Sequence, residues 1–252
     1  MATRLSTLKI ATLSLLLSGT TFAATSALHP SLGTGEAKRV GLTAPSSAKA
    51  LEGDPYLLEI DGVSGKALGA LETQVIIQHE GRELRFAGEK TAALFRAEPA
   101  KYLASIDQKM IAQQLPFYPL ETCVVSGEKL GGKMGAAVDI IYKNRLVRFC
   151  CKGCKKTFHK NPEKALAKID KAVLESQTAK YPLATCLVTG EKLGGMGAPI
   201  DYIVGNRLVR LCCKGCKKDF AKDPLAYLAK LDSASGAEAD RPDAHDGHDH
   251  NH

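Results

Sequence analysis

Residues 147–156 read VRFCCKGCKK, and residues 209–218 repeat them almost unchanged as VRLCCKGCKK. One further cysteine precedes each copy, Cys123 in the run YPLETCVVSGEKLG and Cys186 in the run YPLATCLVTGEKLG. These two groups contain all eight cysteines of the 252-residue chain. Four sulfurs at matching positions in two places indicate one kind of site that the sequence builds twice.

The two cysteine-bearing segments belong to a threefold repeat with a period of roughly 62 residues. We place the repeats at residues 55–112, 116–176 and 179–232. The first repeat keeps the frame of the others but has no sulfur. Its residues at the four cysteine positions are Asp61, Ala87, Gly88 and Thr91. The sequence therefore predicts three small tandem modules, two of which carry a sulfur site.

Each module is predicted to contain a β-hairpin. In the second repeat, residues 138–142 and 145–149 are β-prone and are joined by Lys143 and Asn144. The third repeat has Gly205 and Asn206 at this junction, which is a stronger turn signal.

Two helices are predicted to follow the hairpin. Residues 154–159 favour a short helix that turns Phe158 inward and ends before Pro162, because a residue that precedes proline avoids the helical region. Asn161 is a typical cap for a second helix, in which apolar residues recur at helical spacing from Leu166 to Val173. We therefore predict an α+β fold of three tandem ββα modules.

The flanking segments have different compositions. Residues 1–27 have a basic start, an apolar stretch and small residues, which is typical of an export signal. Residues 28–54 are rich in Gly, Ser, Ala, Thr and Pro and predict a flexible leader, and the polar residues 233–252 predict a disordered tail. We expect a soluble periplasmic or secreted protein with no stable membrane insertion after cleavage of the signal.

The cysteines allow more than one chemistry. Modules of about fifty residues usually need a metal or disulfides for stability, and an exported protein can use either. Within repeat two, Cys151 and Cys154 have the spacing of a metal-binding turn, whereas Cys150 and Cys154 converge if the backbone is already helical there. Flanking lysines such as Lys152 favour thiolates. Thiol redox activity is the weakest alternative, because no βαβ pattern surrounds the Cys-x-x-Cys pairs.

The run Tyr-Pro-Leu-x-Thr-Cys, the hairpin and the following Cys-Cys-x-x-Cys-Lys-Lys-x-Phe resemble the YHS or TRASH-type heavy-metal domains. The resemblance covers repeats two and three well and repeat one only as a frame. It implies a treble-clef-like or zinc-ribbon-like module that binds metal for trafficking, storage or sensing, and it implies no catalytic activity. The cysteines that match the family pattern are Cys123, Cys150, Cys154, Cys186, Cys212 and Cys216. Cys151 and Cys213 are additional to it, and we retain them as candidate ligands.

The end of the chain adds a weaker candidate site. His245, His248, His250 and His252 alternate with aspartates, a composition that gathers Zn, Ni or Cu(II) loosely. Trp is absent and aromatics are few, so we expect no nucleic-acid binding. The leading hypothesis is a non-enzymatic extracytoplasmic protein that binds Zn, Cu(I) or another heavy metal and serves a metal-transport or metal-resistance protein. A disulfide-stapled interaction module without metal is the alternative.

Overall fold

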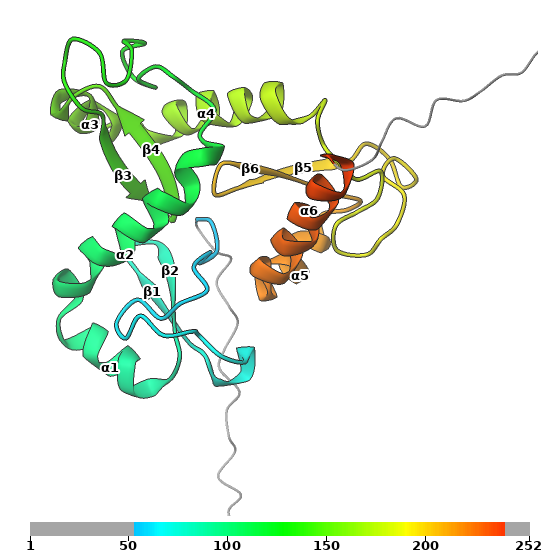
Figure 1. Cartoon of the computed structure of the whole chain (residues 1–252), viewed down its shortest axis with the longest axis horizontal. Helices are drawn as coiled ribbons and strands as arrows, with labels where there is room; N and C mark the ends of the chain where they lie inside the picture. Colours follow the sequence, from blue (N-terminus) through cyan, green and yellow to red (C-terminus); the bar gives the residue numbers. More distant parts are fainter. Residues whose placement is uncertain (1–52, 240–252) are drawn as a thin grey trace, which may run out of the picture. The chain divides into compact units, whose positions relative to one another are not determined.

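The computed structural model describes residues 53–239, and Figure 1 shows the order of their elements. The fold is α+β, as predicted: three two-stranded antiparallel sheets occur in these residues, and each is followed by helices. A tight turn closed by an isolated β-bridge precedes each sheet. The predicted export signal (residues 1–27) lies outside the described residues, as do residues 28–52 of the predicted leader (28–54) and residues 240–252 of the predicted tail (233–252).

The three repeats share two strands followed by two α-helices, and the first repeat has two short 3-10 helices in addition. The elements of the first are η1 (Leu71–Thr73), β1 (Val75–His79), β2 (Arg82–Phe86), α1 (Glu89–Ala97), α2 (Pro99–Gln114) and η2 (Leu115–Phe117), of which η1 and η2 are the 3-10 helices. Those of the second are β3 (Val138–Tyr142), β4 (Arg145–Phe149), α3 (Lys152–Phe158) and α4 (Pro162–Gln177). Those of the third are β5 (Ile200–Val204), β6 (Arg207–Leu211), α5 (Cys216–Lys222) and α6 (Pro224–Ala239).

The predicted hairpins and caps are confirmed. Strands β3 and β4 pair antiparallel from Val138 opposite Phe149, and both turn residues between them have positive φ. Phe158 points into the core of repeat two and is 1% exposed. The Asn161 side chain accepts a hydrogen bond from the backbone N–H of Lys164 and so caps α4.

An ion pair from an arginine links the long helix of each repeat to its hairpin. This arginine is the first residue of the second strand, and it pairs with an aspartate in the middle of the 16-residue helix. The pairs are Arg82–Asp107, Arg145–Asp170 and Arg207–Asp232. The first repeat has therefore kept the structural frame although it has no cysteine.

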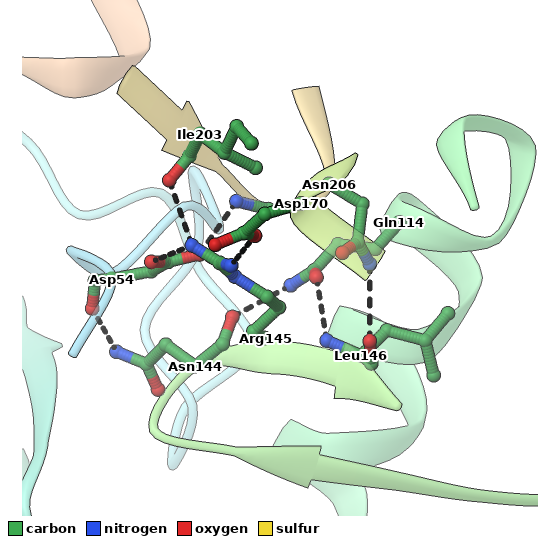
Figure 2. Close-up of polar contacts among 9 residues, drawn as sticks. Asp54, Gln114, Asn144, Arg145, Leu146, Asp170, Ile203 and Asn206 are labelled. Carbon is green, nitrogen blue, oxygen red and sulfur yellow. Dashed lines mark hydrogen bonds and ion pairs between the residues drawn. The ribbon is translucent and has the colours of Figure 1, made fainter. Parts of the chain in front are cut away.

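A glutamine at the end of the long helix joins each of the first two repeats to the next. The Gln114 side chain donates to the carbonyl of Asn144 (2.8 Å) and accepts from the N–H of Leu146 (2.8 Å), as Figure 2 shows. Gln177 makes the same two bonds one repeat later, to the carbonyl of Asn206 (3.0 Å) and the N–H of Leu208 (2.8 Å). The helix end of one module thus holds the hairpin turn of its successor.

Two predicted boundaries differ from the structure. Asp54, predicted as the end of the flexible leader, is 6% exposed and forms an ion pair with Arg145 at 2.8 Å. Residues 233–239, predicted as part of a disordered tail, continue helix α6. Alanine favours helix, so the helix extends beyond its last core residue, Leu231. The hydroxyls of Ser233 and Ser235 bond to carbonyls one turn earlier and so have partners within the helix.

Candidate metal centres

The upstream cysteine of each sulfur-bearing repeat lies in a tight turn. The N–H of Cys123 donates to the carbonyl of Glu128 (2.7 Å), and the N–H of Gly127 donates back to the carbonyl of Cys123 (2.8 Å). Cys186 has equivalent bonds of 2.7 and 2.9 Å in repeat three. Both cysteines are almost fully buried, at 2% and 1% exposure. The turn therefore holds one sulfur at a fixed place inside the module.

The downstream cysteines lie where the second strand of the hairpin passes into the short helix. Cys150 directly follows β4 and is 3% exposed, and Cys154 lies in α3. Their Sγ atoms are 3.7 Å apart, and those of Cys212 and Cys216 are 3.6 Å apart. The structure thus brings together the cysteines four residues apart in both repeats, and in repeat three it also brings Cys213 within 3.5 Å of Cys216.

Three sulfurs converge in each of these repeats. The two groups are Cys123, Cys150 and Cys154, and Cys186, Cys212 and Cys216. Within each group all Sγ atoms lie within 4.8 Å of one another. Two thiolates about 2.3 Å from a tetrahedral zinc ion are about 3.8 Å apart. The separations of 3.6–3.8 Å between several of these sulfurs match that edge, so each group can hold a metal ion.

The remaining two cysteines lie beside the three-sulfur groups. Cys213 has its Sγ 3.5 Å from that of Cys216, and Cys151 is the residue that caps α3. Both are half-buried, and neither belongs to the set of three mutually close sulfurs. All eight cysteines are free thiols. A disulfide would need a sulfur–sulfur distance of about 2.05 Å.

A hydroxyl group contacts each sulfur group. Ser126 Oγ is 3.3 Å from Cys150 Sγ, and Thr189 Oγ1 is 3.5 Å from Cys212 Sγ. Because a hydroxyl is a poor ligand for a soft ion, it would act as a hydrogen-bond donor to a sulfur. The donors that converge in each group are then three sulfurs, with Cys151 or Cys213 beside them.

Hydrogen bonds make one thiol of each group acidic. Burial raises the pKa of Cys123, but hydrogen bonds from Ser126 and from the N–H groups of Cys150 and Val125 outweigh it and lower this pKa to about 6. The pKa of Cys186 is likewise lowered to about 6, with Thr189 in the role of Ser126. Burial and the neighbouring thiols raise the pKa of Cys154 to about 12. At neutral pH each group thus contains a thiolate that can receive a cation, and full coordination would release further protons.

The cysteine-free repeat has a carboxylate where the others have this thiolate. Asp61 is fully buried, and its two oxygens accept hydrogen bonds from the N–H groups of Val63 (2.8 Å), Ser64 (2.9 Å) and Ala87 (2.8 Å). Ala87 is the counterpart of Cys150, so the carboxylate is bonded as the Cys123 thiolate is. The sequence alone shows only that repeat one has no cysteine at these positions. The signal for this role was an acidic residue at a position that the turn buries.

Of the predicted ligands, the structure therefore brings six cysteines together in two groups and places the other two beside them. His245, His248, His250 and His252 lie outside the described residues. Within residues 53–239, no helix is both long enough and apolar enough to cross a membrane. No family model matches the chain, and neither a curated protein nor a solved structure matches it.

Proposed function

We propose that this chain is a non-enzymatic extracytoplasmic protein that holds one soft or borderline metal ion in each of its two three-sulfur groups. The convergence of Cys123, Cys150 and Cys154, repeated one module later, carries the proposal. Thiolate donors favour Zn, Cu(I) and other heavy metals over Mg or Ca. The buried first thiolate and the sulfur separations described above support the same conclusion.

The finer assignment is to a treble-clef-like module of the YHS or TRASH type. The order of elements supports it: a tight turn with one cysteine, a hairpin, and a helix with another cysteine in its first turns. The cysteines that converge are also those that the family resemblance selects. Cys151 and Cys213 are surplus to both.

A donor set of three thiolates would leave one coordination position of the ion open, which supports a role in metal trafficking, storage or sensing. A structural zinc site is usually closed by four protein ligands, whereas a site with three can exchange its ion with another molecule. We propose that the exchanging partner is a metal-transport or metal-resistance protein. The histidines of residues 245–252 would act as a weak collector of ions, and the basic and apolar N-terminus supports a periplasmic or secreted location.

The test is metal content measured on the full chain purified without oxygen. We expect close to two ions per chain, by analogy with structural zinc sites that bind with apparent free energies of about 10–16 kcal/mol. The double variant Cys154→Ser and Cys216→Ser should lose both ions, because each centre would keep only two thiolates. The matched control, Cys151→Ser with Cys213→Ser, should retain them.

Two results would contradict the proposal. One is equal metal content in the Cys154→Ser, Cys216→Ser variant and the wild type. The other is a metal-free chain whose thiols are all oxidised when it is isolated from its native compartment, which would favour the disulfide-stapled module instead. Counting free thiols on the same sample distinguishes a metal site from a disulfide-stapled module.

A further inference from the structure

The two most exposed large apolar side chains of the described residues are both methionines. Met134 is 59% exposed and Met196 is 71% exposed. The sequence has four methionines, of which Met1 is the first residue and Met110 is buried in repeat one at 1% exposure. Both exposed methionines therefore belong to the repeats that carry cysteine. The first repeat has Leu71 in the equivalent loop, and no methionine there.

The loops that carry these methionines connect the two halves of each sulfur group. In repeat two, the N–H of Leu130 bonds to the carbonyl of Glu121 (2.9 Å), two residues before Cys123. The loop then ends at Val138, which pairs with Phe149, the residue before Cys150. Met134 is midway between these anchors.

The loop of repeat three has the same anchors. The N–H of Leu193 bonds to the carbonyl of Ala184 (3.0 Å), two residues before Cys186, and Ile200 pairs with Leu211, the residue before Cys212. Met196 lies between them. Each loop thus begins next to one candidate ligand, ends next to another, and carries an exposed methionine between them.

A glycine in the left-handed region follows each of the two methionines. Met134 lies in a turn closed by a bond from the N–H of Gly135 to the carbonyl of Gly132 (3.0 Å). Gly135 and Gly197, which follow the methionines, have φ of +85° and +106°, and no atom lies within 4 Å of the Cβ position of either. A methionine side chain is unbranched and has three rotatable bonds and a polarizable sulfur, so an exposed methionine can adjust its position to a bound ion.

We propose that Met134 and Met196 are receiving ligands, each of which binds a soft monovalent cation at the surface and passes it to the three thiolates of its own repeat. This proposal rests on the function proposed above and selects Cu(I) as the chemical class of cargo. A neutral thioether is a soft ligand that suits Cu(I), whereas the usual protein ligands of Zn(II) are Cys, His, Asp and Glu. The transfer is a ligand exchange without a redox step: the cation leaves the thioether for a thiolate, and the protons of the remaining thiols go to water.

The test is the rate of metal uptake by the full, reduced chain from a coloured Cu(I) chelate, followed by stopped-flow absorbance without oxygen. The variant Met134→Leu with Met196→Leu preserves the size and apolarity of both side chains. We expect it to load Cu(I) severalfold more slowly than the wild type and to reach the same final stoichiometry. Zn(II) uptake from a zinc chelate should proceed at the same rate in both proteins.

The matched control is Leu71→Met, which adds a thioether to the equivalent loop of the repeat without thiolates, and it should leave the Cu(I) rate unchanged. Equal Cu(I) rates for the wild type and the double leucine variant would overturn the inference while leaving the two thiolate sites intact. Equal slowing of Cu(I) and Zn(II) would also overturn it, because loop structure rather than thioether chemistry would then be the cause. Failure of the wild type to bind either ion would overturn the proposed function as well.

Discussion

At the scale of single residues, the chain uses two kinds of side chain to accept hydrogen bonds from the N–H groups of the same buried turn. Cys123 and Cys186 present a sulfur to the surrounding N–H groups, and Asp61 presents a carboxylate. A buried N–H group that loses its acceptor destabilises the fold, so the turn needs an anion or a metal-bound ligand at this place. In repeat one the carboxylate provides it without a metal.

The carboxylate of Asp61 makes the stability of repeat one depend on pH. Burial raises the pKa of Asp61, but hydrogen bonds involving Thr91, Ser64, Ala87 and Val63 outweigh it and hold this pKa below its ordinary value. A carboxyl with a depressed folded pKa adds stability above its unfolded pKa of about 3.9 and loses it as the pH falls through the folded pKa. The Asp61→Asn variant should therefore have a lower free energy of unfolding at pH 7, by about 1–3 kcal/mol.

Urea unfolding of the metal-free chain at pH 7 and at lower pH measures this difference. The gap between the wild type and Asp61→Asn should narrow below about pH 4, where Asp61 begins to be protonated in the unfolded chain. Glu72→Gln is the control, because Glu72 is exposed in the same repeat. A gap that is independent of pH would show that the charge of Asp61 does not contribute.

At the scale of elements, the same residue types join successive modules at both boundaries. We call the contact between the end of one long helix and the next hairpin turn the joint. Glutamine is the last residue of α2 and of α4, and asparagine is the second turn residue of the hairpins that follow them. The Asn144 side chain donates to the carbonyls of Asp54 (3.0 Å) and Glu83 (2.7 Å), and Asn206 donates to the carbonyl of Leu146 (3.1 Å). The hairpin turn of repeat one has Gly81 in place of this asparagine, and α6 ends in Ala239 in place of the glutamine. Within residues 53–239, this contact therefore occurs at the two boundaries between successive repeats.

Removing one glutamine should weaken the joint. Gln114 is 1% exposed, and Gln114→Ala would leave the N–H of Leu146 and the carbonyl of Asn144 buried without their partner. We expect the free energy of unfolding to fall by about 2–6 kcal/mol, at about 1–3 kcal/mol for each of the two unsatisfied groups. Chemical denaturation measures the change. Gln108→Ala on the exposed side of α2 is the matched control, and an equal effect of both variants would contradict the role of the joint.

At the scale of the whole described unit, Asp54 links the second and third repeats. Its carboxylate accepts two hydrogen bonds from Arg145, at 3.0 and 2.8 Å (Figure 2). It accepts a third from the N–H of Gly205, at 2.7 Å. Arg145 also donates to the carbonyl of Ile203 (2.8 Å) and pairs with Asp170. The neighbouring carboxylates raise the pKa of Arg145 further above its ordinary value, against the effect of burial. One buried arginine thus has partners in the leader, in its own module and in the next.

Truncating Asp54 should cost more stability than losing a surface ion pair. Removing one partner of a buried pair typically costs about 3–5 kcal/mol, because the other charge stays buried. We expect this loss in Asp54→Ala by urea unfolding, with metal content per folded chain unchanged. Glu89→Ala, which removes the exposed Glu89–Arg96 pair, should change stability by at most about 1 kcal/mol. A loss of stability as small as this in Asp54→Ala would show that the ion pair between Asp54 and Arg145 contributes little to the fold.

Most of the modular organisation could be predicted from the sequence. The repeat period, the hairpins and the helix caps rest on local patterns of a few residues, and the hairpins lie where the β-prone segments and their turn residues place them. The two sulfur sites could also be located, because all eight cysteines occur in two repeated groups. The end of α6 was misjudged because a polar composition does not prevent a helix rich in alanine from continuing.

Only the tertiary structure decided which sulfurs meet and what holds the modules together. Cys150 and Cys151 are adjacent in sequence, and the direction of the chain between β4 and α3 turns the first toward Cys123 and leaves the second at the side. Asp54 finds partners 91 and 151 residues away. A local pattern reports the preference of a segment for helix, strand or turn, whereas these contacts exist only after distant segments have packed.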